Sequence, residues 1–355
     1  MSRPLIVTAD ADLLDDLLRL AATSGVEADV ANEAAAARRC WAAASLVLVG
    51  ADLAEACGRG RLGRRQGVVV VGDDLDDAGV WQRAVQVGAE HVVFLPDAEP
   101  WLISALADAV EGRAQDGLLV AVVGGRGGAG ATTLAGALGQ AGIRRGLRAL
   151  LVDADPLSGG IDLLFGAELA TGLRWPDLGR SRGRLPAQAL AEALPTFEGL
   201  AVLSTGREQD APLQLEAVQS VLSAARRTFE LVVVDLPRSF DEVSCEVLSQ
   251  AGTTLLIVPS EVRATAAAAQ VAARAVLLCR DVRLVVRGPA PGGLGAAEVG
   301  RALGLPLAGC VRAEPGLESA LERGEPPAAR DRSPLAGLCA ELLDNLVDSS
   351  LRRSA

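Results

Sequence analysis

Lysine is absent from this chain of 355 residues, so all 34 of its basic residues are arginine, and histidine occurs only once. We interpret the missing lysine as the signature of a GC-rich genome. Acidic residues outnumber basic ones and leave a formal net charge of −11. This charge argues against broad nucleic-acid binding, and we expect no specific nucleic-acid partner.

The chain also lacks the patterns of several protein classes. Its six cysteines form no C-x-x-C pair, which argues against a disulfide framework or a zinc site and favours free thiols in a reducing cytosol. The first residues do not form the basic and then apolar segments of a secretory signal. No apolar run approaches the roughly 20 residues needed to span a bilayer. We therefore expect a soluble, cytoplasmic protein.

Apolar residues are abundant instead: they make up half of the chain, whereas 22% of residues are charged. This balance is typical of a folded globular protein, and the length is sufficient for two domains with separate cores.

Residues 1–113 alternate short apolar runs with amphipathic segments. Helical periodicity is clearest over residues 11–22 and 80–87. The strand-like runs are 4–8, 26–30, 45–49, 67–71 and 91–95. Five such βα units predict a small, doubly wound parallel sheet.

This order of elements resembles the receiver domain of response regulators, but the charged residues of a receiver are missing. A receiver has an acidic pair after its first strand, an aspartate at the end of its third and a lysine at the end of its fifth. Here Asp10 stands alone after the first strand. The third strand ends at Gly50, and Asp52 comes two residues after the position of the receiver aspartate. Leu95 stands at the lysine position. We therefore predict a flavodoxin-like pseudo-receiver domain over 1–113 that makes protein contacts without being phosphorylated.

Residues 114–117 belong to a short polar segment that we predict to be a linker to a second domain, residues 118–350. In this domain the helical segments include 212–227 and 263–278. Its apolar runs are nearly continuous and lie at 118–123, 149–152, 200–203, 231–234, 254–258, 282–286 and 307–311. Such runs mark strands covered on both faces, so we predict a doubly wound, mostly parallel sheet of about seven strands.

A glycine-rich loop follows the first strand of the second domain. Its pattern Gly125-x4-Gly130-Ala131-Thr132 agrees with the phosphate-binding G-x-x-x-x-G-K-[ST] loop at every position except the lysine. Glycines at such a junction let backbone N–H groups approach an anion at the start of a helix. The same glycines satisfy the G-x-G-x-x-G fingerprint of a Rossmann domain, in which Asp153 would bind a ribose hydroxyl of NAD(P) or FAD. An empty structural loop is a third interpretation.

Acidic residues at strand ends favour a nucleoside-triphosphate site over a dinucleotide site. Asp153 and Asp155 follow the next strand, and a later apolar strand ends at Asp235 in the form of a Walker B motif. Thr132 and Thr133 open the helix, where a P-loop has its Mg²⁺ ligand. A Rossmann domain requires neither the second aspartate strand nor the threonine pair.

These motifs resemble the MinD/ParA family of P-loop ATPases. Residues 126–133 are similar to the deviant Walker A motif K-G-G-x-G-K-T-T of that family, and the two aspartate strands lie where the family has its switch I and switch II aspartates. The resemblance covers about residues 118–350. With a pseudo-receiver in front, the chain resembles the CpaE/TadZ branch and, more narrowly, the actinobacterial septum-site-determining and CpaE-like proteins.

The resemblance implies a role for each matching residue. Thr132 would bind Mg²⁺, with Asp235 behind it. Asp155 would orient the attacking water and Asp153 would support switch I, which makes these two the candidate catalytic residues. Arg126 would reach across a homodimer to the partner's phosphates, although its planar fork is not a lysine equivalent. The residues that would line the phosphates of ATP are Gly127, Gly128, Ala129, Gly130, Ala131 and Thr133.

Ala131 replaces the second lysine of the motif. That lysine stabilises negative charge between the β- and γ-phosphates, and the loss of one such group costs roughly 10²–10³ in rate. The backbone N–H groups and Mg²⁺ do not depend on it. We therefore predict ATP binding and ATP-dependent dimerisation, with hydrolysis slow or absent.

An apolar stripe runs along the last helical segment, at Leu335, Leu338, Leu342, Leu346 and Val347. MinD proteins use a C-terminal amphipathic helix on lipid, and the resemblance implies the same role here, at the inner face of the plasma membrane. The polar face of this segment, however, carries acidic residues where lipid-binding helices favour lysine and arginine. We expect the helix to pack against the core, with peripheral membrane association as the alternative.

The predicted function is that of a nucleotide-binding spatial regulator. Its ATP-dependent homodimer would recruit protein partners in septum-site determination, or localise a Tad-type pilus or secretion machinery. One alternative is a nucleotide-independent interaction scaffold with a vestigial P-loop. The other is an NAD(P)- or FAD-binding Rossmann enzyme.

Overall fold

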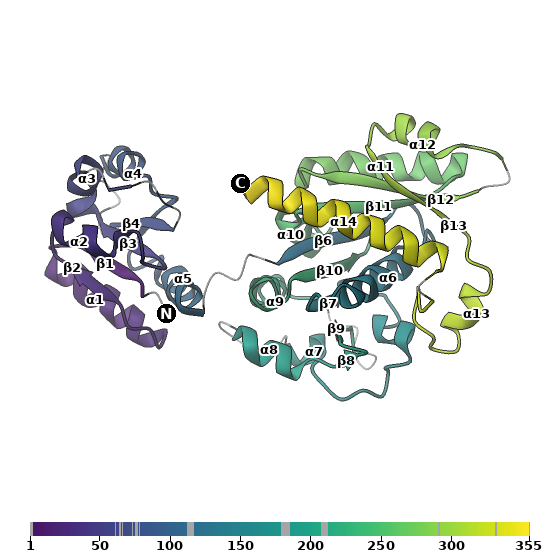
Figure 1. The fold of residues 1–355 in the computed structure, drawn as a ribbon, viewed down its shortest axis with the longest axis horizontal. Helices are drawn as coiled ribbons and strands as arrows, with labels where there is room; N and C mark the ends of the chain where they lie inside the picture. The colour runs from purple at the N-terminus through teal and green to yellow at the C-terminus, as the bar shows by residue number, and fades with distance from the viewer. Residues whose placement is uncertain are drawn as a thin grey trace. The chain divides into compact units, whose positions relative to one another are not determined.

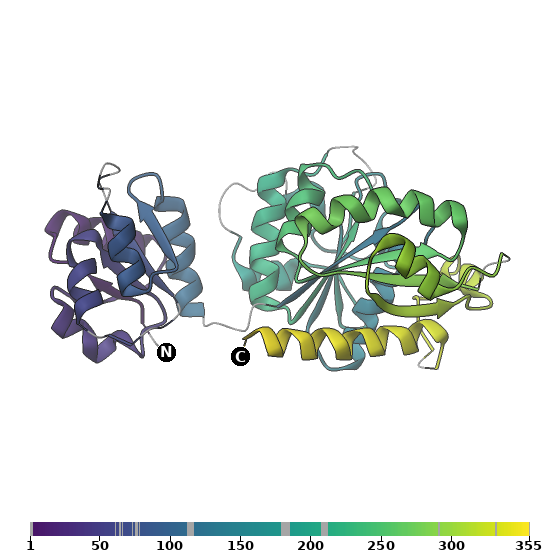
Figure 2. The same cartoon turned by 90° about the horizontal axis from the view of Figure 1, so that it is seen from above.

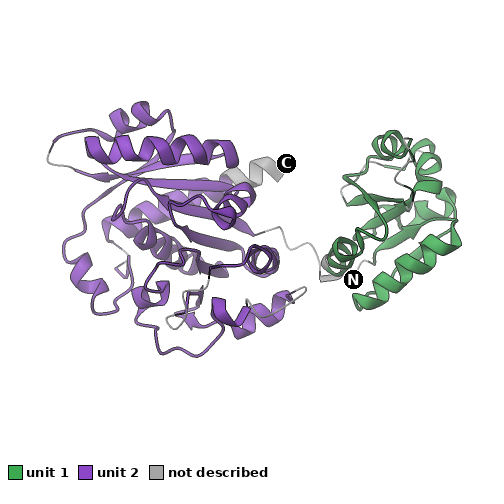
Figure 3. Cartoon of the chain, turned by 180° about the vertical axis from the view of Figure 1, so that it is seen from behind, with its two compact units in different colours: residues 1–113 green, residues 114–355 purple. Residues whose placement is uncertain are grey.

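The protein consists of two compact units, residues 1–113 and 114–355 (Figure 3). The computed structural model describes residues 3–354, with the exception of 61, 64, 66, 73, 75, 76, 78, 112–116, 179–184, 207–211, 290, 291 and 331. The predicted linker, 114–117, lies outside the described residues except for Gly117.

The first unit is a five-stranded parallel sheet with the strand order β2-β1-β3-β4-β5. This is the flavodoxin-like order, so the predicted receiver-like fold is confirmed. The strands are β1 (Leu5–Val7), β2 (Asp29–Ala31), β3 (Val47–Gly50), β4 (Val68–Gly72) and β5 (His91–Phe94). The helices are α1 (Ala11–Thr23), α2 (Ala34–Trp41), α3 (Ala51–Arg59), α4 (Val80–Val87) and α5 (Glu99–Glu111).

Strand β2 begins later than the sequence predicts, at Asp29 instead of residue 26. The reason is the end of α1. Gly25 has a positive φ of 68°, and the N–H of Val26 donates to the carbonyl of Ala21 (2.9 Å). The backbone of Val26 thus completes the helix end and is not part of the sheet, although its side chain is buried.

The second unit is an eight-stranded sheet with the order β13-β12-β11-β6-β10-β7-β9-β8 (Figure 1). The strands are β6 (Leu118–Gly124), β7 (Ala149–Asp153), β8 (Thr196–Phe197), β9 (Leu200–Leu203), β10 (Leu231–Leu236), β11 (Thr253–Pro259), β12 (Val282–Gly288) and β13 (Leu307–Arg312). All pairs are parallel except β8–β9. The doubly wound, mostly parallel sheet is confirmed; the two-residue edge strand β8 is too short to be predicted.

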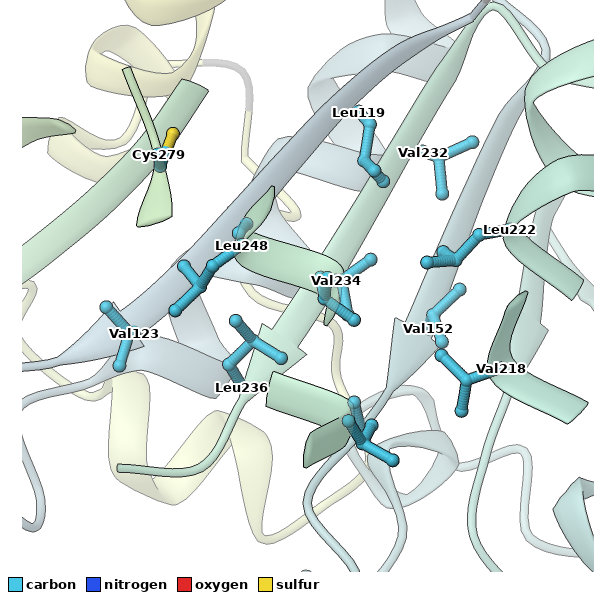
Figure 4. Close-up of a cluster of buried hydrophobic side chains, with 14 of the residues drawn as sticks. Leu119, Val123, Val152, Val218, Leu222, Val232, Val234, Leu236, Leu248 and Cys279 are labelled. Carbon is cyan, nitrogen blue, oxygen red and sulfur yellow. The ribbon is translucent and has the colours of Figure 1, made fainter. Parts of the chain in front are cut away.

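Helices cover both faces of this sheet, and each face has its own apolar core because successive strand residues point to opposite sides. Helices α6 (Ala131–Arg144) and α14 (Pro334–Ser354) lie on one face, where α14 is the yellow helix of Figure 2. The core on this face includes Val120, Val122 and Val233 of the sheet. Helices α9 (Leu215–Thr228), α10 (Glu242–Gln250) and α11 (Val262–Leu278) pack on the other. That second core is drawn in Figure 4. The remaining elements are η1 (Ile161–Phe165), α7 (Trp175–Leu178), α8 (Ala187–Ala193), α12 (Ala296–Leu303) and α13 (Leu317–Leu321).

Strand order also discriminates between the two nucleotide-binding folds considered above. In the classical Rossmann order the second strand lies beside the first. Here β10 lies between β6 and β7, with Asp235 in register with Val122 on one side and Asp153 on the other. Because this order inserts the Walker B strand next to the glycine loop, it is that of a P-loop domain and contradicts the Rossmann alternative.

Helix α14 carries the apolar stripe expected to face the core. Leu335, Leu338, Leu342 and Leu346 are all at most 5% exposed and belong to the core beneath α6. Arg145, at the end of α6, pairs with Asp344 and donates to the carbonyl of Ala340. The expected core packing is confirmed. Among the described residues, no helix is long and apolar enough to cross a membrane.

Candidate functional site

The glycine loop connects β6 to α6 at the carboxyl end of the sheet. Gly125 is fixed against the neighbouring strand: its N–H donates to the carbonyl of Ile257 (2.8 Å). A β-carbon at Gly125 would lie 2.7 Å from the Ala268 Cβ and 2.8 Å from the Val258 Cγ2. Gly128 has a φ of 68°, and a β-carbon there would meet nothing within 4 Å. One glycine is therefore required by packing, and the other by backbone conformation beside open space.

The loop ends at the N-terminus of α6, which no side chain caps. Gly130 is the N-cap residue, with a φ of 99°, and it has no side chain that could accept from the first turn. The first N–H groups of a helix have no partner within the helix, and the helix dipole adds positive potential there. An uncapped start of a 14-residue helix beside open space is thus suited to an anion such as a phosphate.

Ala131 leaves this anion site without a lysine. Its methyl group is half-buried and packs against the core under α6. Positive charge at the loop therefore has to come from elements other than the first turn of α6.

Asp235 lies at the end of β10, directly behind the first turn of α6. Its side chain accepts a hydrogen bond from the Thr132 hydroxyl and is only 3% exposed. The pKa of Asp235 is raised to about 7, chiefly by burial, and the charges of Asp153 and Asp155 act in the same direction. The Thr132 hydrogen bond opposes the shift. The predicted threonine–aspartate pair is therefore brought together beside the phosphate loop.

Asp153 is fully buried and holds the loop that follows β7. Its carboxylate accepts from the Ser158 hydroxyl (2.5 Å), from the N–H of Asp155 (3.1 Å) and from the N–H of Ile161 (3.0 Å). Burial raises the pKa of this carboxyl group, and these hydrogen bonds act against the rise. Because the Asp153 side chain is fully buried and both of its oxygens accept hydrogen bonds from its own chain, it is not exposed to a ribose, which is a second observation against a Rossmann cofactor.

Asp155 is half-buried and lies at the edge of the site, two residues after the end of β7. Its Oδ1 accepts from the N–H of Leu157 (3.0 Å), which closes a short turn after β7. Its charge acts on Asp235, so the two carboxyl groups are neighbours.

Arg126 is held by an ion pair within its own chain. Its Nη2 lies 3.1 Å from the Glu261 Oε1, and both side chains are about 40% exposed, at 38% and 40%. Its Nε is buried without a hydrogen-bond partner in the described part of the chain. Any contact of Arg126 with a second subunit would require this ion pair to open.

Two arginines near the loop are not identified by the sequence motifs. The Nη2 of Arg238 lies 3.8 Å from the point where a β-carbon on Gly127 would stand. The Nη1 of Arg287 lies 3.5 Å from the corresponding point on Gly130. Both residues come at or just after the carboxyl end of a parallel strand, the edge at which ligands bind in such sheets. A search of the sequence for charged residues at the carboxyl end of every predicted strand would have identified both arginines as candidate ligand-binding residues.

A cavity of about 670 Å³ opens beside the loop and extends to the ends of β12 and β13. Gly128, Gly130 and Thr133 line it at the loop, and Arg287 and Glu314 line it farther along. Its volume is within the range of small-molecule and cofactor sites. The uncapped helix start and the cavity together therefore fit a nucleotide.

In the first unit, the two aspartates at the receiver positions are engaged with the backbone. Asp10 caps α1 by accepting from the N–H groups of Asp12 and Leu13. Asp52 accepts from the Thr8 hydroxyl (2.9 Å) and from the N–H groups of residues 9 and 10. Leu95 packs against the apolar core where a receiver has lysine. These contacts agree with a domain that is not phosphorylated.

Comparison with known proteins gives matches for both units. The model of the family described as "Rv3660c-like, CheY-like N-terminal domain" matches residues 7–117, and that of "Cellulose biosynthesis protein BcsQ" matches residues 118–287. The uncharacterized protein Rv3660c of Mycobacterium tuberculosis is 43% identical over 338 residues, which are 94% of this chain and 95% of that protein. The Nephroselmis olivacea protein described as "Putative septum site-determining protein MinD" is 25% identical over 232 residues, which are 63% of this chain and 84% of that protein.

Solved structures match the second unit at lower identity. The MinD cell division protein of Aquifex aeolicus has a TM-score of 0.54 at 23% identity and covers 64% of this chain and 97% of its own. It has also been solved as a MinC:MinD complex, with a TM-score of 0.55 at 22% identity, covering 64% and 96%. MinD of Pyrococcus horikoshii OT3, complexed with Mg-ADP, has a TM-score of 0.51 at 16% identity, covering 66% and 98%. These likenesses agree with the fold.

Proposed function

Because this chain belongs to the MinD/ParA family of P-loop ATPases and has a CheY-like domain in front of its P-loop domain, we propose that it is a nucleotide-binding spatial regulator. It binds ATP with Mg²⁺, dimerises in response and hydrolyses the nucleotide slowly or not at all. The dimer then recruits protein partners at a defined place in the cell.

The observation that carries this proposal is a complete backbone site without its lysine. The loop keeps Gly128 and Gly130 at positive φ, and the start of α6 is uncapped, although Ala131 supplies no charge. A vestigial loop would be under no constraint to preserve this conformation. The proposal follows because backbone N–H groups bind phosphate without the lysine, whereas fast phosphoryl transfer needs its charge.

Within this site the bound groups would contact few side chains. Residues 127–131 and Thr133 would surround the phosphates, and Thr132 with Asp235 behind it would hold Mg²⁺. Among the described residues, no three acidic, histidine or cysteine side chains converge to form a metal site. Mg²⁺ would therefore depend on nucleotide and water oxygens for most of its ligands, and it would neutralise phosphate charge there.

Asp155 and Arg126 would act in hydrolysis and in dimerisation, respectively. Asp155 would orient a water molecule toward the nucleotide, with Asp153 holding its loop through the bond to its N–H. Arg126 would leave Glu261 and reach the phosphates of a partner subunit. Its buried Nε, which has no partner in the described residues, supports a second position for this side chain.

The named relatives support the choice of pathway. MinD of Aquifex aeolicus forms a complex with MinC, and MinD of Pyrococcus horikoshii binds Mg-ADP. By analogy, this protein would act in septum-site determination, or localise a Tad-type pilus or secretion machinery as CpaE-like proteins do. It would work in the cytoplasm, with peripheral contact to the membrane as the weaker alternative, since the apolar stripe of α14 is used in the core.

The pseudo-receiver would add a surface for protein partners. Trp81 and Val85 on α4 are 59% and 72% exposed, and Trp101 on α5 is 39% exposed. Exposed aromatic side chains are enriched at protein interfaces relative to the rest of the surface. They support a docking role for this domain.

Isothermal titration calorimetry of the whole chain with ATP and with ADP, at millimolar Mg²⁺, tests the proposal. We expect binding of both nucleotides, and light scattering should report a dimer with ATP. A chain that binds neither nucleotide would instead be the scaffold with a vestigial loop. The Gly128→Asp variant is the matched control, because a carboxylate in the open space at the loop should abolish phosphate binding.

A further inference from the structure

Arg287 belongs to a strand that is not adjacent to β6, yet its side chain lies beside the glycine loop. It is the penultimate residue of β12, a strand that is separated from β6 by β11. In the sheet it pairs in register with Pro259 of β11. Its side chain nevertheless extends to the phosphate loop, where its Nη1 is 3.5 Å from the position of a β-carbon on Gly130. The guanidinium is thus adjacent to the N-cap of α6.

The guanidinium and the uncapped helix start face the same cavity. Arg287 lines the cavity together with Gly128, Gly130 and Thr133. Three acidic residues also line it: Glu261, Glu314 and the exposed Glu318. Glu261 is engaged by Arg126, and the Oε2 of Glu314 is buried without a hydrogen-bond partner among the described residues.

Arg287 is available to bind an anion in this cavity. Throughout the described part of the chain, its guanidinium makes no ion pair with a carboxylate. Arg283, four residues earlier on the same strand, is by contrast paired with Asp281 at 2.8 Å. Guanidinium groups form strong, often bidentate hydrogen bonds with phosphate oxygens.

We propose that Arg287 binds the phosphates of the nucleotide and supplies the positive charge that Ala131 does not. This inference rests on the proposed nucleotide binding and adds a residue to it. In a P-loop the backbone N–H groups surround the α- and β-phosphates, and the lysine extends to the β- and γ-phosphates. Because Arg287 lies beside Gly130 and Thr133, it contacts the α/β side. It therefore holds ADP and ATP about equally and does not replace the lysine in phosphoryl transfer.

The test compares the affinities of Arg287 variants of the full chain for Mg-ATP and Mg-ADP by calorimetry. Arg287→Gln should weaken both nucleotides by roughly ten- to a hundredfold, the effect of removing one charge-assisted hydrogen bond. Arg287→Lys should recover part of the loss. Arg312→Gln is the matched control, since Arg312 lines the same cavity and is exposed. It should cost less than threefold, about 0.6 kcal/mol.

A charge exchange gives a second, independent readout. In the double variant Ala131→Lys with Arg287→Gln, the loop lysine should restore ATP affinity to within about threefold of the wild type, which also shows that the Arg287→Gln chain still folds. Equal losses of nucleotide affinity in Arg312→Gln and Arg287→Gln would show that any positive charge in the cavity has the same effect, and this would overturn the proposal. So would wild-type affinity in Arg287→Gln. A wild-type chain that binds no nucleotide would instead refute the proposed function itself.

Discussion

Replacing Asp235 by asparagine should change how the stability of the second unit, residues 114–355 (the P-loop unit), depends on pH. The pKa of this buried carboxyl group is raised from 3.8 to about 7 in the folded chain. Between these two values the folded state keeps a proton that the unfolded state has lost. The stabilisation by Asp235 is therefore complete below pH 3.8 and is lost as the pH rises through about 7. Asparagine cannot titrate, so the variant lacks this loss.

The magnitude follows from the gap between the two pKa values. One pKa unit corresponds to about 1.4 kcal/mol, so the full difference amounts to about 4 kcal/mol. Between about pH 5 and pH 8 the wild type should lose about 2 to 3 kcal/mol more than Asp235→Asn. Asp153, whose pKa burial also raises, is present in both proteins and contributes to both curves.

Urea unfolding of the whole chain, followed by circular dichroism in EDTA without nucleotide, measures this difference. The two units can unfold separately, and the transition that responds to the substitution belongs to the P-loop unit. Asp348→Asn is the control, because Asp348 is an exposed aspartate of α14 and its replacement removes the same side-chain charge outside the site. Parallel curves for the wild type and Asp235→Asn would refute the raised pKa, and with it the effect of burial and of the two neighbouring carboxylates on Asp235.

Four further substitutions test other parts of the site and fold. Gly125→Ala forces a β-carbon into side chains of α11 and β11 and should lower the free energy of unfolding in urea by about 1–3 kcal/mol. At Gly128 a β-carbon meets no atom, so Gly128→Ala should cost about 1–2 kcal/mol from its positive φ alone. Overpacking at Gly125 would be disproved by a thermal midpoint equal to that of the wild type. Ala131→Lys should raise ATP turnover by roughly 10²–10³ in a phosphate-release assay, and no increase would mean that another group limits hydrolysis. Leu342→Asp, at a position 2% exposed on α14, should destabilise the unit by at least about 3 kcal/mol, and unchanged stability would show that α14 leaves the core.

The sequence is sufficient to predict most elements because their signals are local. Continuous apolar runs locate the strands of the P-loop unit to within two residues at each end, and the glycine loop is placed correctly between β6 and α6. The late start of β2 is missed because a carbonyl of α1 captures the N–H of Val26. Strand β8 is missed because two residues have no periodicity.

The site is only partly predictable, because its charges come from separate strands. Thr132 and Asp235 could be paired from motif spacing alone, and they are hydrogen-bonded. Two roles for Asp153 remained open from the sequence, since only the sheet order and the bonds to Ser158 and Ile161 distinguish them. Arg287 could not be found from spacing, because its contact with the loop depends on the length of its side chain and on the position of β12.

Burial, and then the charges of two neighbouring carboxylates, raise the pKa of Asp235 at a loop that has no lysine. The charges of Asp153 and Asp155 add to the effect of burial on Asp235, and Arg126, the cation of the loop, is paired with Glu261. Without a nucleotide, a proton on Asp235 reduces the repulsion. With a nucleotide, Mg²⁺ would take over that function, since a divalent ion favours the ionised carboxylate. The loop would therefore bind phosphates and Mg²⁺ as a unit, which is the behaviour expected of a switch that holds its nucleotide and not of a fast ATPase.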